Sequence, residues 1–229
     1  ADAAYGGYFG LASTLAPDTR AAYDRLTEVD SIVIDPHKHG LQPYGCGCVL
    51  FRDADVGRFY KHDSPFTYFS SAELHLGEIS LECSRPGASA VALWATQQLL
   101  PLEPGGAFAK GLEQSLGAAR TFHERLAASN YYQPMMTPEL DIVVYMPKAD
   151  DAQTVRKRTR HVFSSAAEKG LHLAMIELPV ELVSRFAPGL AANAETVTCL
   201  RSVLMKPEHA DWLDQIMTIL EAAAQEARE

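Results

Sequence analysis

The sequence contains little of what marks secreted or membrane-spanning proteins. Four cysteines are scattered over 229 residues, and their spacing does not form a disulfide framework. Sparse cysteines are typical of a reducing cytoplasm. No apolar run reaches the roughly 18 residues that cross a bilayer, and the start of the chain lacks the basic and apolar segments of a secretion signal. We therefore expect a cytoplasmic protein without a membrane partner.

Long basic runs are also missing. The chain carries 20 basic against 29 acidic residues, a formal net charge of −9. This balance argues against nucleic acid or an anionic membrane as the main partner. The composition, with 47% hydrophobic and 21% charged residues, is that of an ordinary globular protein. The length suggests one or two domains.

Periodicity and turn residues predict an α/β protein. The segment 53–82 has little periodicity and is predicted to be a long loop. The helix expected at 88–100 is apolar almost all round, which indicates a buried helix. We expect residues 1–129 to be part of a larger domain and residues 130–229 to form a small α/β domain. Helices are predicted at 17–26, 88–100, 108–128, 151–169 and 207–227, and strands at 30–35, 47–52, 141–146, 171–178 and 196–205.

Two segments near the start carry groups suited to catalysis. Asp2 opens one of them, and Lys38 follows a strand that Pro36 ends. Ligands of α/β sheets bind beyond the carboxyl ends of strands, so Asp2 and Lys38 can face one pocket. A lysine amine condenses with an aldehyde cofactor, and a carboxylate keeps a pyridine nitrogen protonated. By itself such a pair is weak evidence, because surface salt bridges and solvated lysines are far commoner.

Two metal-site interpretations are weighed against simpler ones. Cys46 and Cys48 would share one face of a strand, where they are better explained as small buried residues than as ligands. His37 and His39 with Asp35 could form a His-x-His metal site. The lysine between the two histidines disfavours that site, and we expect no metal.

Several motifs together resemble the pyridoxal-phosphate-dependent decarboxylases related to glutamate and aromatic amino-acid decarboxylases. The resemblance is densest in residues 2–48, and it continues more faintly to the strand before the last helix. It implies the C-terminal part of an aspartate-aminotransferase-like (fold type I) enzyme: the remainder of the large domain plus a small α/β domain. The motifs are Asp-Ala-Ala-Tyr-Gly-Gly at 2–7, Asp-Ser-Ile-Val-Ile-Asp-Pro-His-Lys at 30–38, Leu-Gln-Pro-Tyr-Gly-Cys-Gly at 41–47, Leu-Glu-Cys-Ser-Arg-Pro-Gly at 81–87 and Leu-Arg-Ser-Val-Leu at 200–204.

The resemblance implies roles at the cofactor. Lys38 would form the Schiff base with pyridoxal 5′-phosphate, and Asp2 would pair with its pyridinium nitrogen. Ala4 would pack against one ring face. His37 would lie near the phosphate and take part in proton transfer, with Asp35 close by. The alternative for His37 is a hydrogen bond within the strand–loop junction.

Further roles lie later in the chain. Arg201 is the candidate for binding the substrate α-carboxylate, because a guanidinium binds a carboxylate with two hydrogen bonds; a structural arginine is the alternative, and Arg85 is a weaker candidate. Tyr68 is the favoured proton donor in the loop, although it could instead pack on a neighbouring subunit. His39 departs from the family, which usually has a large aromatic residue there.

These expectations predict decarboxylation of an L-amino acid to the amine and carbon dioxide. The alternatives are an aldehyde-forming or aminotransferase-like enzyme using the same cofactor, and a non-catalytic subunit that keeps the fold. Large domains of the family include an N-terminal half that this sequence does not contain. We therefore expect a companion chain or omitted N-terminal half, and a dimer of such pairs. The identity of the amino acid does not follow from these residues.

Overall fold

A computed structural model describes residues 1–59, 61 and 87–229. The chain divides into two compact units. The first comprises Ala1–Ala12 and Ala16–Phe108, and the second comprises Ser13–Leu15 and Ala109–Glu229. The predicted boundary at residue 129 differs from this grouping, because the helix that begins at Ala107 packs from Ala109 onward with the second unit.

The first unit is built around a short sheet. Its two strands pair antiparallel, with Ile34 opposite Cys48. The start of the chain runs beside the first strand as a parallel bridge between Asp2 and Val33. The elements are η1 (Gly7–Leu11), α1 (Pro17–Asp24), η2 (Arg25–Glu28), β1 (Ser31–Ile34), β2 (Cys48–Phe51), η3 (Ala54–Phe59) and α3 (Ala88–Leu99).

The prediction that α3 is buried is wrong for the described residues. The helix forms where its apolar sequence predicts it, but none of its residues is buried. Val91 is 64% exposed and Trp94 is 62% exposed. A helix that is apolar all round needs packing partners on every side. The residues that the structure describes pack against only some sides of α3.

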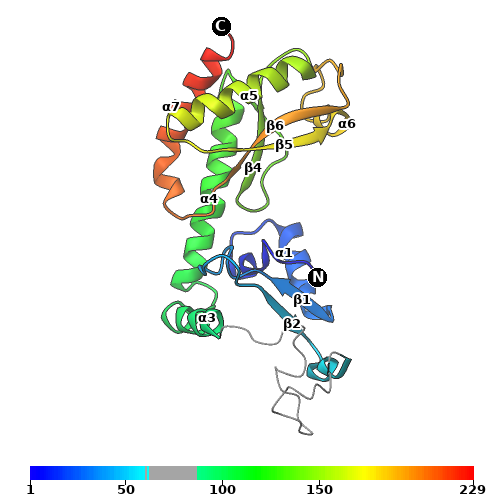
Figure 1. Cartoon of the computed structure of the whole chain (residues 1–229), viewed down its shortest axis with the longest axis vertical. Helices are drawn as coiled ribbons and strands as arrows, with labels where there is room; N and C mark the ends of the chain where they lie inside the picture. Colours follow the sequence, from blue (N-terminus) through cyan, green and yellow to red (C-terminus); the bar gives the residue numbers. More distant parts are fainter. Residues whose placement is uncertain (60, 62–86) are drawn as a thin grey trace. The chain divides into compact units, whose positions relative to one another are not determined.

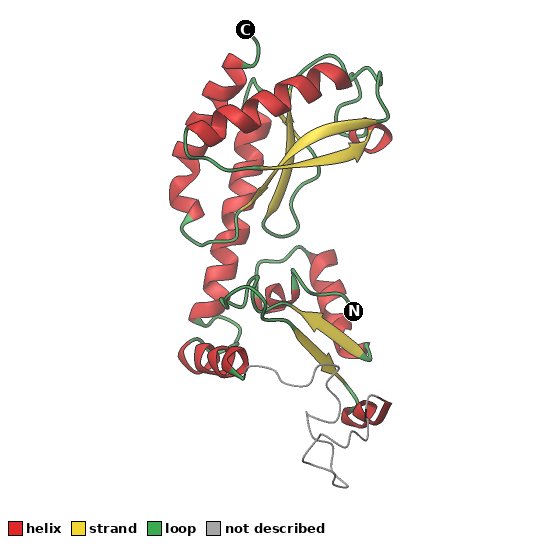
Figure 2. Ribbon diagram, in the orientation of Figure 1, coloured by secondary structure: helices red, strands yellow, loops and turns green. Residues whose placement is uncertain are grey.

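The second unit is a four-stranded antiparallel sheet in the order β3-β4-β6-β5, with helices packed against it (Figure 1 and Figure 2). The predicted helices and strands are all present, with ends shifted by a few residues. The three-residue strand β3 and the one-turn helix α6 were not predicted. The elements are α4 (Ala107–Ala128), β3 (Tyr132–Pro134), β4 (Ile142–Pro147), α5 (Ala152–Glu168), β5 (Ala174–Pro179), α6 (Val180–Val183), β6 (Thr196–Val203) and α7 (His209–Glu226).

The main core of the second unit lies between this sheet and α4, α5 and α7. Phe122 of α4 and the strand residues Tyr132 and Tyr145 are fully buried and stack edge to face, with ring centroids 5.5 Å apart. The buried Tyr132 hydroxyl donates to the Leu220 carbonyl of α7 at 2.6 Å, so it keeps a hydrogen-bond partner away from water. Among the described helices, none is long and apolar enough to cross a membrane.

Candidate active site

Asp35, Pro36, His37 and Lys38 form a tight turn at the end of β1. The Lys38 backbone N–H donates to the Asp35 carbonyl at 2.9 Å. The turn also brings the Lys38 Nζ to 2.8 Å from Asp35 Oδ2. The hydrogen bond from Lys38 lowers the pKa of Asp35 from its ordinary value. The turn thus presents an amine and a carboxylate as an ion pair, with both side chains only partly exposed.

His37 is fixed from its Nδ1 side. Both its backbone N–H, at 3.1 Å, and its Nδ1, at 2.7 Å, contact the Cys46 carbonyl. A carbonyl only accepts, so Nδ1 carries the proton in this contact. The other ring nitrogen, Nε2, lies 3.8 Å from Asp35 Oδ2, and the Tyr44 ring packs 5.1 Å from the imidazole. The hydrogen bond within the strand–loop junction, weighed above as an alternative, is therefore present.

The first segment of the chain lies against the same strand end. Backbone hydrogen bonds of 3.0 Å join Ala3 N–H to the Val33 carbonyl and Asp35 N–H to the Ala4 carbonyl. Asp2 is exposed, and its Oδ1 accepts from the Ala4 N–H at 3.1 Å. The segment beginning at Asp2 thus pairs with the end of β1, from which the turn bearing Lys38 continues. That Asp2 and Lys38 face one pocket stays a prediction.

His39 joins the two segments from inside, a role that the sequence did not reveal. It is only 3% exposed, and its Nδ1 lies 2.9 Å from the Tyr5 carbonyl. Its ring stacks edge to face with Tyr5 and Phe9, at 4.6 and 4.8 Å between centroids. The imidazole thus packs as an aromatic ring between the two segments.

Gly40 closes the turn, and no larger residue fits. A Cβ there would lie 2.5 Å from the Tyr8 hydroxyl and 2.7 Å from Pro36 Cα. Next, Leu41 adopts a positive φ of 59°, which is uncommon for a residue other than glycine. The buried Gln42 then donates its backbone N–H to the Pro36 carbonyl at 3.1 Å and its Nε2 to Thr96 Oγ1 of α3 at 2.8 Å. The backbone that follows Lys38 is therefore held at several points.

Arg201 belongs to the second unit. It lies on β6, opposite Val144 of β4 and Ala174 of β5. It is exposed and, within the described residues, makes no ion pair. It lines a pocket formed wholly by residues of the second unit. Tyr68 and Arg85 lie outside the described residues.

The first unit therefore gathers five of the predicted residues: Asp2, Ala4, Asp35, His37 and Lys38. No cluster of metal-binding side chains occurs among the residues that the structure describes. His37 and His39 each direct Nδ1 to a backbone carbonyl, and Cys46 is buried.

Comparisons with known proteins identify the family of the chain. The family model described as "Pyridoxal-dependent decarboxylase conserved domain" matches residues 1–148. The L-tyrosine decarboxylase of Levilactobacillus brevis is 28% identical over 165 residues, which are 67% of this chain and 26% of that protein. A probable L-tyrosine/L-aspartate decarboxylase of Methanothermobacter thermautotrophicus is 32% identical over 151 residues, which are 63% of this chain and 37% of that protein.

Solved structures establish the fold. Mouse CSAD superposes with a TM-score of 0.75 at 20% identity, over 98% of this chain and 45% of that one. Oryza sativa TDC with PLP and tryptamine gives a TM-score of 0.75 at 14% identity, over 98% of this chain and 44% of that one. The chain thus spans less than half the length of these relatives. It has the fold of a part of a fold type I enzyme, and it belongs to the pyridoxal-dependent decarboxylases, a family of amino-acid carboxy-lyases that use pyridoxal phosphate.

Proposed function

We propose that this chain carries pyridoxal phosphate on Lys38 and serves an enzyme that converts an L-amino acid to its amine and carbon dioxide. The observation that carries the proposal is the Lys38–Asp35 pair at 2.8 Å on the turn after β1. It lies inside the segment that the family model matches. The named relatives are decarboxylases of tyrosine or aspartate, and the amino acid used here stays open.

The residues present fit the cofactor. An aldehyde needs an amine that it can reach, and the Lys38 side chain is 32% exposed. His37 and Asp35 beside it are 18% and 19% exposed, so the turn is neither sealed nor fully solvated. Ala4 is partly buried on the adjoining segment, where its small methyl group would pack against a planar ring.

When bound, pyridoxal phosphate is joined through its aldehyde carbon to an amine, and its protonated pyridine ring draws in the electron pair of the bond that breaks. We assign the carboxylate that keeps this ring protonated to Asp2. The Ala4 N–H orients that carboxylate through the 3.1 Å bond to Oδ1. A fixed negative charge favours the protonated form of a nearby pyridine.

Lys38 would hold the cofactor through its Nζ, which pairs with Asp35 at 2.8 Å. An amine acts as a nucleophile only without its extra proton, so a neighbouring group would have to accept that proton. His37 is placed to take part, because its Nδ1 is bound to the Cys46 carbonyl and its Nε2 faces Asp35. We assign to His37 the movement of protons beside Lys38.

We assign to Arg201 the binding of the substrate carboxylate. Its guanidinium is exposed and, in the described part of the chain, makes no ion pair with an acidic side chain. It can therefore pair with the carboxylate of a ligand. Tyr68 remains the proposed proton donor to the carbon that loses carbon dioxide. Each turnover then releases carbon dioxide and consumes one proton.

We further propose that the first unit is completed by a companion chain or by an N-terminal half, and that such pairs form dimers. The curated relatives named above are about three to four times as long as the matched segment. The first unit also exposes large apolar side chains, among them Val91 and Trp94 of α3 and Val49 and Leu50 of β2. Exposed apolar side chains in this number support an interface. The cytoplasmic location remains a prediction.

Borohydride reduction tests the lysine. Reduction fixes the cofactor to the amine that carries it, and peptide mass spectrometry then identifies the residue. We expect the label on the peptide containing Lys38 and its loss in Lys38→Ala. Lys157→Ala, which changes an exposed lysine of α5, is the matched control and should keep the label. A label that persists at the same peptide in Lys38→Ala would refute the assignment.

A panel of amino acids tests the reaction. We expect carbon dioxide and amine in equal amounts, with one proton consumed per turnover and neither ammonia nor aldehyde released. Ammonia with an aldehyde would instead identify an aldehyde-forming enzyme, and transfer of the amino group to a keto acid would identify an aminotransferase-like one. A cofactor-loaded protein that turns over no member of the panel would favour a non-catalytic subunit.

A further inference from the structure

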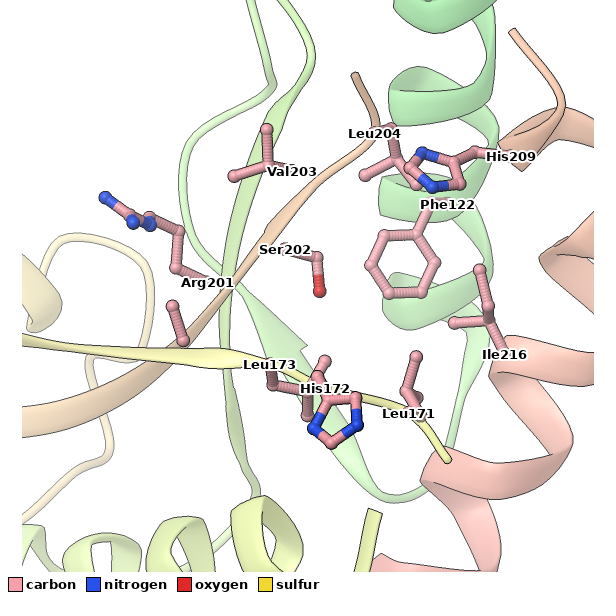
Figure 3. Close-up of a pocket in the computed structure, with 11 residues that line it drawn as sticks. Phe122, Leu171, His172, Leu173, Arg201, Ser202, Val203, Leu204, His209 and Ile216 are labelled. Atoms are coloured by element: carbon pink, nitrogen blue, oxygen red, sulfur yellow. The ribbon is translucent and has the colours of Figure 1, made fainter. Parts of the chain in front are cut away.

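The second unit contains a pocket of about 280 Å³, and of the residues that line it the proposed chemistry uses only Arg201. Figure 3 shows its lining side chains converging from α4, α7, β6 and the segment before β5. The apolar part of the wall consists of Phe122, Leu171, Leu204 and Ile216. Phe122 and Leu204 are buried, so this wall belongs to the hydrophobic core.

The pocket exists because β5 begins late along its partner. The pairing of β5 with β6 starts at Ala174 opposite Arg201. On the other side, β4 continues to pair with β6 through Ser202 and Val203. At Ser202 and Val203, β6 therefore has no partner residue in β5, and its open side borders the pocket. Such a gap in a sheet edge exposes backbone and side chains that a strand would otherwise cover.

The polar side chains that line the pocket, apart from Arg201, are Ser202, His209 and the exposed His172. Ser202 Oγ lies 3.0 Å from the hydroxyl of Tyr145, a fully buried residue. Burial lowers the pKa of His209, which favours its neutral imidazole. Arg201 also borders the pocket, but its guanidinium extends away from Phe122 and His209, on the other side of the strand (Figure 3). Successive strand residues point to opposite faces, which separates Arg201 from Ser202.

We propose that this pocket binds a small uncharged aromatic ligand that carries one hydroxyl, a compound of the phenol class. The apolar wall receives the ring, and the hydroxyl bonds to Ser202. An anion would lose its hydration inside without meeting a positive charge on the inner wall. The volume is close to the lower end of ligand pockets, which limits the occupant to a single ring. This proposal does not rest on the decarboxylase function.

Three probes of the same shape test the ligand class. We expect para-cresol to bind the purified full chain with a dissociation constant of about 1 mM, as is typical of so small a ligand. Toluene lacks the hydroxyl and should bind about five-fold more weakly, which is the effect of one hydrogen bond. 4-Methylbenzoate should bind more weakly still. The readouts are saturation-transfer NMR of each probe and the shifts of the His209 ring signals.

Two substitutions on one helix test the location. Ile216→Trp fills the pocket and should abolish para-cresol binding. Ile219→Trp changes a partly buried residue of the same helix that does not line the pocket, and it should leave binding unchanged. Ser202→Ala should weaken para-cresol about five-fold and leave toluene unaffected. Circular dichroism confirms that each variant is folded, and Leu171→Trp replaces Ile216→Trp if that one is not.

Three outcomes overturn the proposal. The first is equal binding of para-cresol by the chain and by a folded Ile216→Trp or Leu171→Trp variant. The second is tighter binding of 4-methylbenzoate, which would identify an anion site instead. The third is the absence of binding by any of the three probes at 10-fold above the expected dissociation constant of about 1 mM.

Discussion

The Nζ of Lys38 lies 2.8 Å from Oδ2 of Asp35, three residues earlier on the same turn. Asp35 also faces His37, whose Nε2 lies 3.8 Å away. One carboxylate therefore borders both basic groups of the turn. Removing its charge should change the stability of the turn in a way that depends on pH.

Asp35→Asn tests this dependence. The pKa of Asp35 is lowered from 3.8, chiefly by the hydrogen bond from Lys38, so the folded state favours the carboxylate. The stabilisation is complete above the unfolded pKa and is lost as the pH falls through the lower folded pKa. We expect the melting temperature of the chain to exceed that of Asp35→Asn by a constant amount near neutral pH, and the excess to shrink below about pH 4.

Asp30→Asn is the control for Asp35→Asn, because it removes an exposed carboxylate just before the same strand. Thermal unfolding followed by circular dichroism over a range of pH measures both variants. A stability difference between the chain and Asp35→Asn that grows on acidification would contradict the ion pair.

Gly40→Ala should destabilise the first unit. The added Cβ would lie within 2.8 Å of the Tyr8 hydroxyl and of two backbone atoms of Pro36, and backbone cannot move aside cheaply. We expect a loss of about 1–3 kcal/mol in the free energy of unfolding, measured by urea denaturation, together with weaker cofactor retention.

Gly117→Ala is the counterpart of Gly40→Ala. A Cβ at this position of α4 meets nothing within 4 Å, so it should stabilise the chain by about 0.5–1 kcal/mol. Equal effects of the two substitutions would show that the contacts around Gly40 do not matter.

Asp151→Ala should weaken the start of α5. The Asp151 carboxylate accepts from the Thr154 N–H at 2.9 Å and from the Thr154 hydroxyl at 2.7 Å. These bonds, together with one from Asn193, lower the pKa of Asp151 to about 2. We expect a lower melting temperature for Asp151→Ala at neutral pH, and a smaller decrease for Asp151→Asn, which retains a cap. Asp150→Ala, which removes the neighbouring carboxylate, should have little effect.

Trp94→Gln should leave the stability of the chain nearly unchanged and reduce the proposed association with a companion chain or N-terminal half. The side chain is 62% exposed on α3, so the free energy of unfolding should change by less than about 0.5 kcal/mol. Trp212→Gln removes the other tryptophan, which is 49% exposed on α7. Sedimentation velocity should show reduced association for Trp94→Gln only, and an equal reduction in both would argue against α3 as an interface.

The sequence predicted the longer elements because their apolar residues repeat with the period of a helix or strand. It missed β3 and α6, which are too short to show a period. The nearness of Asp35 and Lys38 follows from their spacing in a turn that Pro36 initiates. A hydrogen bond of His37 within the strand–loop junction was weighed, but its partner Cys46 could not be predicted, because it depends on how β1 pairs with β2.

The exposure of α3 shows a different limit. Apolar composition predicts that a helix will find a packing partner, but it does not say on which chain or segment that partner lies. His39 illustrates the opposite case. The sequence disfavoured a metal site at His39 but assigned the residue no role, whereas the structure places its ring among Tyr5 and Phe9, where it acts as packing.

The position of His39 also matters for engineering. The residue after Lys38 is anchored in the segment that begins at Asp2, through the Tyr5 carbonyl and the Phe9 ring. Transplanting the lysine turn alone into another scaffold would leave His39 without its contacts to Tyr5 and Phe9. A graft of this turn would therefore need at least the segments 2–9 and 35–42 together, and Cys46, whose carbonyl holds His37.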